Sequence, residues 1–352
     1  MEEQKRKEIR EEKLRNFNEN ENGLRDHGIF GLPFDVAESE LVIVPLPWEA
    51  TVSYATGTVE GSDAVLEASQ QIDLYDPLCP TAWREGVAIL QKDVNIEKSN
   101  IETRAKVDDY LTKYTEGKID NELLSQINKS CEDFKSKVKA ITTDLLNQGK
   151  FVGLLGGDHS TPLGYMEALA EKHKNFGILH IDAHADLREA YEGFTYSHAS
   201  IFYNALKIKQ VDKLVQVGIR DFSKSEQDLV DREDGRVKMF TEYELRKALF
   251  TGSTWGKVCE NIVNELPEKV YISFDIDGLS PYLSPNTGTP VVGGFSLDEI
   301  IFLFEKVLQS GKQIIGFDLS EVAPGEDEWD GNVGARVLYK LCLLSLKNKV
   351  NV

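Results

Sequence analysis

The sequence predicts an α/β protein in which helices cover both faces of a parallel sheet. Eight short segments rich in Val, Ile, Leu and Phe alternate with longer stretches whose apolar residues recur every three or four positions. Continuous apolar runs are typical of strands buried on both faces, and their alternation with helices is typical of parallel sheets. Polar motifs follow three of the segments, as expected at the carboxyl edge of such a sheet. Periodicity alone does not distinguish an open sheet from a closed barrel.

The expected elements follow in order along the chain. Strands are predicted at residues 40–46, 87–90, 151–155, 177–182, 214–219, 237–240, 270–275 and 313–317. Helices are predicted at residues 61–75, 121–147, 162–174, 197–206, 242–249, 257–266, 297–309 and 336–346. Residues 92–120 are polar, and we expect them to form an irregular excursion on the surface.

We expect a short arm followed by one domain. Residues 1–22 are almost all charged or polar, which predicts an N-terminal arm that is loose or becomes helical with a partner. No linker, repeat or low-complexity segment interrupts the sequence after residue 22, so residues 23–352 are predicted to form a single domain.

Composition narrows the class of protein. The chain has a formal net charge of −19, which argues against nucleic-acid binding and is compatible with either a cationic substrate or simple solubility. No apolar run approaches the ~20 residues that span a bilayer, so no membrane association is expected. The four cysteines include no CxxC pair, and the N-terminus lacks an apolar signal core. These features predict a cytoplasmic protein.

The central motif lies at the end of the strand at residues 177–182. Asp182, His184 and Asp186 occupy alternate positions there, so an extended backbone presents all three on one face. Carboxylate oxygens and a neutral imidazole nitrogen suit a divalent metal ion. The alternative is a solvated strand end that leads into a helix cap.

Two further strand ends favour a metal site over a solvated strand end. His159 follows Gly156-Gly157-Asp158, and Asp275 and Asp277 alternate in Ser273-Phe-Asp-Ile-Asp277. Four clustered carboxylates would repel one another without a cation. Six ligands exceed the needs of one ion and suit two ions that share bridging carboxylates.

The three motifs, in this order, resemble the metal motifs of the ureohydrolases, the family of arginase, agmatinase, formimidoylglutamase and guanidinobutyrase. The resemblance covers about residues 40–347, and within the family the chain is agmatinase-like. It extends to the loop 50–57, to Gly288-Thr-Pro290 with Gly293-Gly294, and to Phe317-Asp-Leu-Ser-Glu-Val-Ala-Pro324. The chain departs from the family in having Ser280-Pro281 where Asp-Pro is usual.

The resemblance implies an open three-layer α/β/α arginase fold with a mostly parallel eight-stranded sheet. It also implies two Mn²⁺ ions per chain and assembly as a trimer or hexamer. One ion would be bound by His159 and Asp186 and the other by His184 and Asp277. Asp182 and Asp275 would bridge them.

The resemblance also assigns catalytic roles. Asp186 would hold the attacking water, and Glu321 would grip the guanidinium. His198 is the candidate proton donor or shuttle, because histidine titrates near neutral pH. The alternative for His198 is a purely structural hydrogen bond. His180 lies on the strand face of Asp182, and we interpret it as a core residue rather than a support for the ligands.

The implied substrate is a small cationic guanidino compound, agmatine first. Tyr54 in the loop 48–61 and Arg188 after the second motif are the candidate contacts for its tail. The Ser-Gly-Asn segment of arginases is absent from residues 188–197, whereas Gly218-Ile-Arg-Asp221 with Glu226 resembles an arginase stretch. Arginase, formimidoylglutamase and guanidinobutyrase activities therefore stay open. Other classes are a mononuclear zinc amine deacetylase and a non-catalytic metal-binding protein.

Overall fold

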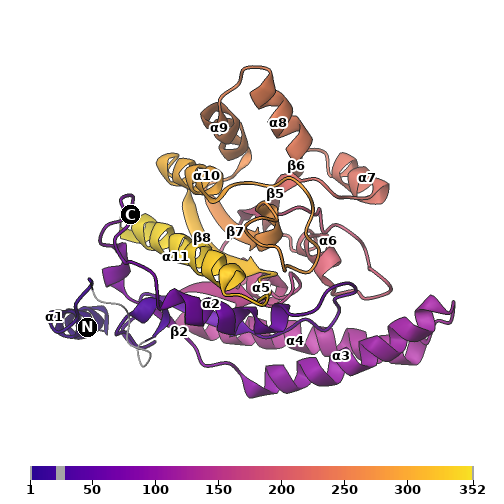
Figure 1. The fold of residues 1–352 in the computed structure, drawn as a ribbon, viewed down its shortest axis with the longest axis horizontal. Coiled ribbons are helices and arrows are strands. Elements are labelled where there is room, and N and C mark those ends of the chain that lie inside the picture. Colours follow the sequence, from indigo (N-terminus) through magenta and orange to yellow (C-terminus); the bar gives the residue numbers. More distant parts are fainter. Residues whose placement is uncertain (1, 21–27, 351–352) are drawn as a thin grey trace.

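The computed structural model describes the backbone of residues 2–20 and 28–350 and contains one eight-stranded sheet. Its strands are all parallel and run in the order β2-β1-β3-β8-β7-β4-β5-β6. The sheet is open, so the predicted three-layer fold is confirmed (Figure 1). The strands are β1 (Leu41–Leu46), β2 (Val87–Ile89), β3 (Phe151–Gly156), β4 (Phe176–Ile181), β5 (Val211–Ile219), β6 (Val237–Thr241), β7 (Lys269–Asp275) and β8 (Gln313–Ser320).

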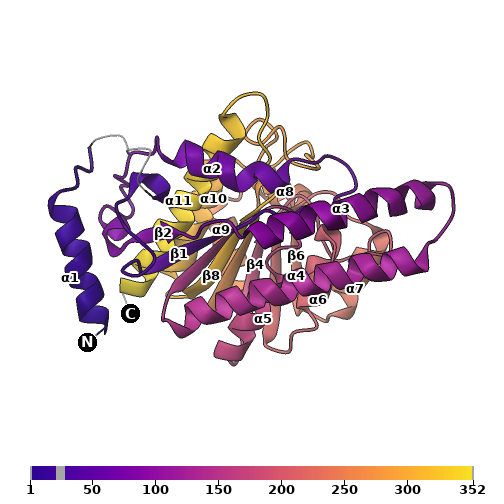
Figure 2. The same cartoon turned by 90° about the horizontal axis from the view of Figure 1, so that it is seen from below.

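Helices cover both faces of the sheet, and a separate apolar core fills each side. One face carries α2 (Gly61–Ser69), α8 (Glu242–Phe250), α9 (Trp255–Glu265), α10 (Leu297–Gln309) and α11 (Trp329–Val350). The other carries α3 (Val94–Thr115), α4 (Asn121–Asn147), α5 (Leu163–Lys172), α6 (Ile201–Ala205) and α7 (Lys224–Arg232). Figure 2 shows α3, α4 and α5 in front of the strands.

The expectation of an irregular excursion at residues 92–120 is wrong, because most of it is helix α3. Asp93 caps this helix by accepting a hydrogen bond from the backbone N–H of Asn95 at 2.8 Å. Its buried positions are spaced helically, but two of them are the polar residues Asn100 and Thr103. Polar side chains on the buried face hide the helical pattern from a hydrophobicity reading.

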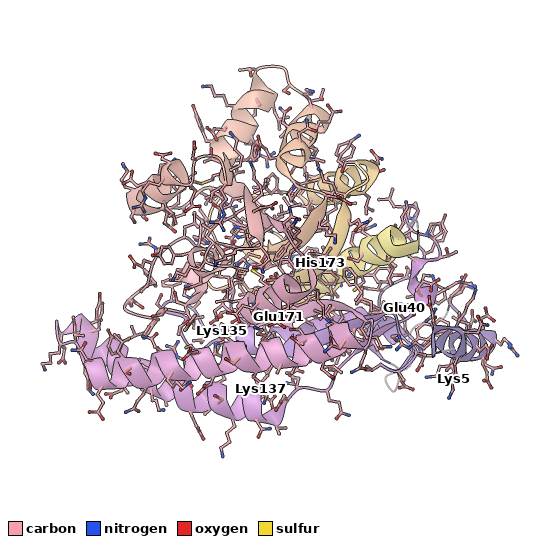
Figure 3. The ribbon with its side chains drawn as sticks, turned by 180° about the vertical axis from the view of Figure 1, so that it is seen from behind. Lys5, Glu40, Lys135, Lys137, Glu171 and His173 are labelled. Atoms are coloured by element: carbon pink, nitrogen blue, oxygen red, sulfur yellow. The ribbon has the colours of Figure 1, made fainter. Side chains whose placement is uncertain are left out.

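Helices α3 and α4 form a long antiparallel hairpin that projects past the rest of the fold (Figures 1 and 2). Figure 3 shows Lys135 and Lys137 along α4 and Glu171 on α5. The Lys135 Nζ atom lies 2.9 Å from Glu167 Oε1 of α5, and Trp48 stacks on Phe134 with ring centroids 4.2 Å apart. These contacts anchor the middle of α4 to the body of the fold.

The N-terminal arm is helical and docked rather than loose. Helix α1 (Glu2–Arg15) places Arg10, only 6% exposed, against the edge of the sheet. Arg10 donates hydrogen bonds to Glu38 O at 2.8 Å, Glu40 Oε1 at 2.9 Å and Glu85 Oε2 at 3.0 Å. The expected boundary at residue 22 lies outside the described residues.

Several element ends differ from the prediction. The last strand continues to Ser320, and the last helix begins at Trp329 rather than at residue 336. The helix that was predicted at residues 61–75 ends earlier, at Ser69. Helix α7 was not predicted, because its one buried residue is Glu226. Among the described residues, every helix falls short of the length and apolar character that a membrane span needs.

Candidate active site

The sheet order brings the predicted motifs together. Strands β3, β8, β7 and β4 are consecutive neighbours, so their carboxyl ends meet at the centre of one sheet edge. Each strand leads directly into one of the polar motifs. Gly157 is needed at the first, because a Cβ atom there would lie 2.0 Å from the backbone oxygen of Trp48.

All six predicted ligands lie in one cluster, in which His184 is partly exposed and the other five are buried. The Nδ1 atom of His159 is 3.0 Å from Asp182 Oδ2, 3.2 Å from Asp186 Oδ2 and 3.2 Å from an oxygen of Asp275. The Nδ1 atom of His184 is 3.0 Å from Asp277 Oδ2 and 3.5 Å from Asp182 Oδ1. Asp182 therefore lies between the two imidazoles and faces both.

The far side of the His159 ring fixes its tautomer. His159 Nε2 lies 3.0 Å from Ser273 Oγ, and Ser273 donates to Asp318 Oδ2 at 2.7 Å. Because the serine proton is used on Asp318, the hydroxyl oxygen accepts from Nε2–H. In the neutral ring, which metal binding requires, the proton is then on Nε2 and the lone pair of Nδ1 is free for an ion.

Three supporting residues were not assigned a role from the sequence. Ser273 lies two residues before Asp275 on the same strand face, a signal that could have found it. Asp318, fully buried on the neighbouring strand β8, carries no such signal. His180 is fully buried, as a core residue would be, yet its Nε2 atom lies 2.7 Å from Asp182 Oδ2. It therefore also supports the ligand cluster.

The clustered carboxylates alter one another's ionisation. Burial and the charge of Asp182 raise the pKa of Asp186 to about 7. Burial, followed by the charges of Asp277 and Asp182, raises the pKa of Asp275 well above its usual range. Burial lowers the pKa of His159, but its three carboxylate partners outweigh this and raise it. A divalent cation would neutralise the cluster and release these protons.

Glu321 is held beside the cluster by three backbone interactions. Its N–H donates to Gly157 O at 2.8 Å, and its C=O accepts from Thr287 Oγ1 at 2.8 Å. Its Oε1 atom accepts from the His159 backbone N–H at 2.8 Å. The residue has a φ of 64°, in the left-handed region, as Asp186 does at 52°. Such strain in non-glycine residues is common at functional sites.

A cavity of about 280 Å³ opens over the cluster. The predicted residues Tyr54, Arg188, His198 and Glu321 all line it, together with Asp186. Tyr54 lies at the rim with 81% of its surface exposed. Further lining residues are Ser53, His184, Tyr191, Ala199, Asp221, Glu226, Asp275, Asp277 and Thr289.

His198 is positioned at the wall of the cavity by a short 3-10 turn, His198–Ser200. Its Nδ1 atom is buried and has no hydrogen-bond partner within the described chain. Burial, followed by the charges of His184 and His159, lowers the pKa of His198 to about 4. The imidazole is therefore neutral at pH 7 and would accept a proton before it could donate one.

Two acidic residues line the cavity besides the predicted metal ligands and Glu321, and one of them has a free carboxylate. Glu226 is fully used, because Oε1 accepts from Leu187 N–H at 3.1 Å and Oε2 accepts from Ser223 N–H and Oγ–H at 2.7 Å each. Asp221 is exposed, and its side chain makes no hydrogen bond to the described residues. Arg188 lies 5.1 Å over the ring of Tyr191 and 3.9 Å from Glu226. Asp221 is therefore available to a cationic ligand.

Fold and site together define a three-layer α/β/α protein with a His and Asp cluster that can bind metal at the carboxyl edge of its sheet. Residues 39–344 match the model of the Arginase family, so the chain belongs to that family. It is therefore an enzyme of the ureohydrolase type, as predicted.

Relatives agree with this assignment. The chain is 30% identical over 302 residues to the N(1)-aminopropylagmatine ureohydrolase of Thermus thermophilus, covering 86% of this chain and 89% of that protein. It is 30% identical over 328 residues to the agmatinase of Neisseria meningitidis serogroup C, covering 90% and 89%. The agmatine ureohydrolase of Thermoplasma volcanium has the same fold, with a TM-score of 0.68, 20% identity and coverage of 97% and 99%.

Proposed function

We propose that the protein hydrolyses a guanidino C–N bond and releases urea, with agmatine as the substrate and two Mn²⁺ ions as the cofactor. The observation that carries the proposal is the arrangement of one cavity. It contains the His and Asp cluster, the carboxylate of Glu321 beside it and the free, exposed carboxylate of Asp221. A metal-dependent reaction on a substrate with a cation at each end needs these three features.

The donor set fits two hard divalent ions. His159 and Asp186 would hold one, His184 and Asp277 the other, and Asp182 and Asp275 would be shared. The position of Asp182 between both imidazoles supports its bridging role. Oxygen-rich ligands with one imidazole for each ion suit Mn²⁺. When bound, a pair of ions lowers the pKa of water from about 15.7 toward neutrality.

The remaining residues orient the substrate and move protons. Glu321 would form a paired hydrogen bond with the guanidinium, because it lines the cavity and its Oε2 atom is left for a ligand. Asp186 would accept a hydrogen bond from the attacking water and hold it in line. His198, neutral at pH 7, would take up a proton and pass it to the leaving amine.

The cavity wall favours agmatine over arginine. Asp221 can pair with the ammonium group of either compound, but arginine also carries a carboxylate. Arg188 is the one Lys or Arg in the lining of the described cavity, and it already lies near Glu226 and over Tyr191. Binding arginine or guanidinobutyrate would require Arg188 to leave these partners.

The test is product release from the Mn²⁺-loaded protein with agmatine, N(1)-aminopropylagmatine, arginine, guanidinobutyrate and formimidoylglutamate. We expect urea from agmatine at the highest kcat/KM. Urea chiefly from aminopropylagmatine would support the proposed reaction and identify a substrate with a longer tail than agmatine. Urea chiefly from arginine or guanidinobutyrate, or formamide from formimidoylglutamate, would overturn the substrate. No product from any of them would overturn the function.

A further inference from the structure

Two loops form the rim of the cavity, and both rest on the α3–α4 hairpin. The first rim loop, residues 48–61, carries Ser53 and Tyr54. The second rim loop, residues 188–197, carries Arg188 and Tyr191 and leads into His198. The loops are far apart in the sequence and belong to different strands. Their relative position therefore depends on whatever contacts both.

The first rim loop is tied to α3. The side-chain oxygen of Asn100, which is buried, accepts from the Glu49 backbone N–H at 2.8 Å. Arg104 donates from Nη1 to the backbone oxygen of Val52, directly before the two cavity residues. Within the loop, Glu49 Oε2 accepts from the backbone N–H of Gly57 at 2.7 Å and closes the loop on itself. The loop thus behaves as one unit attached to α3.

The second rim loop is tied to both helices of the hairpin. Asn128 of α4 donates to Gly193 O at 3.1 Å and accepts from Thr195 N–H at 2.9 Å, so one amide holds two backbone groups. The rings of Tyr110 and Phe194 pack with centroids 5.3 Å apart. Gly193, at a φ of 90°, passes so close to the hairpin that a Cβ atom would lie 2.9 Å from Leu124.

Arg104 is the residue of α3 that holds the first rim loop directly before its two cavity residues. Its Nη2 atom donates to Asp108 Oδ1 at 2.5 Å, which fixes the guanidinium on its own helix. Its Nη1 atom donates to the backbone oxygen of Val52. In the second rim loop, Glu192 has a φ of 53°, and its Oε2 atom is buried without a hydrogen-bond partner among the described residues. Burial raises the pKa of the Glu192 carboxyl group, and the charge of Arg104 opposes that rise.

We propose that the α3–α4 hairpin sets the spacing of the two rim loops and thereby decides which substrate tails the cavity accepts. Its positioning residues are Arg104, which holds the first rim loop, and Asn128, which holds the second. Neither residue lines the cavity or contacts the metal ligands. The inference concerns the tail pocket and rests on the function proposed above.

Arg104→Gln tests the proposal through kinetics. Removing the charged donor releases the backbone oxygen of Val52 and with it the first rim loop, so KM for agmatine should rise about tenfold. The preference for agmatine over arginine should shrink, while kcat and the Mn²⁺ content stay near the wild-type values. Arg104→Lys should restore much of the KM, because it keeps the charge and one donor. Lys98→Gln, on the same helix with a 77% exposed side chain, is the matched control and should match the wild type.

Hydrogen exchange gives a readout that does not depend on activity. Arg104→Gln should speed amide exchange in the first rim loop, and Asn128→Ala should speed it in the second. Wild-type KM and wild-type exchange in both variants would overturn the proposal, as would a loss of kcat together with metal. If the wild-type protein releases no urea, the proposed function fails, and the exchange data alone decide whether the hairpin positions the loops.

Discussion

The metal cluster and the cavity rim are held in place by different means. The cluster residues follow parallel strands whose backbones are joined in register, as at Ile181 opposite Phe274 and Asp275 opposite Ser320. The rim residues lie on loops that are held by single side chains from α3 and α4. Under the proposed function, the metal chemistry would depend on the hydrogen-bonded sheet, and the choice of substrate would depend on side-chain contacts outside the sheet.

The largest effect should come from the cluster. We expect Asp275→Asn to lose at least one of the two ions, because an amide cannot replace the charge of a bridging carboxylate. Urea release should fall by about a thousandfold or more. Elemental analysis together with a urea assay measures both. Retention of two ions by this variant would contradict the bridging role of Asp275.

Glu321 lies at the boundary between the two regions and should have the next largest effect. Glu321→Gln keeps an acceptor for the His159 N–H but loses the charge that pairs with a guanidinium. We expect kcat/KM to fall about a hundredfold. The metal content should stay at the wild-type level, which separates this variant from Asp275→Asn. Unchanged turnover on agmatine would remove Glu321 from guanidinium binding.

The cluster should also respond to pH. Burial and the charge of Asp182 raise the pKa of Asp186 to about 7 in the metal-free protein. Protons on Asp186, and on Asp275 and His159 whose pKa values are also raised, compete with the metal, so affinity for Mn²⁺ should fall by at least about tenfold for each pH unit below 7. Titration calorimetry at several pH values measures this. Constant affinity between pH 5 and pH 8 would contradict the assignment of Asp186 as a ligand.

The same shift predicts the stability of the metal-free protein. An acid whose pKa is raised by folding destabilises the fold as pH rises from its unfolded value of about 3.9 toward 7. We expect the increase in Tm on adding Mn²⁺ to be larger at pH 7.5 than at pH 5. An increase that is the same at both pH values would show that the carboxyl groups keep no proton.

The smallest effect should come from the rim. Asp221→Asn removes the free carboxylate from the cavity lining, so KM for agmatine should rise about tenfold with little change in kcat. Asp228→Asn, at an exposed position of α7, provides a matched control. If Asp221→Asn leaves KM unchanged, the ammonium group of the substrate is recognised by a residue other than Asp221.

The proximity of the six cluster residues could be predicted because they follow strand ends. His184 and Asp186 follow Asp182 at the spacing of an extended chain, and the parallel sheet brings the other motifs to the same edge. The parallel sheet and both helical layers could be predicted from the alternation of apolar runs with helical patterns.

Rim residues such as Tyr54 and Arg188 were predicted, but the contacts that hold the rim loops could not be, because they are made by single polar side chains distant in the sequence. Asn100 is buried on α3 against Glu49, and no periodicity marks such a pair. Polar residues on the buried face also hid α3 itself. Asp318 was missed for the same reason, since its partner Ser273 lies on a neighbouring strand.

The binuclear centre can be tested by a Mn²⁺ titration of the metal-stripped protein, with agmatine present and urea release as the readout. We expect no activity without metal and a rise that saturates at two ions for each chain. Saturation at one ion would contradict the binuclear centre and favour a mononuclear enzyme. Full activity in the stripped protein would contradict the role of the His and Asp cluster altogether.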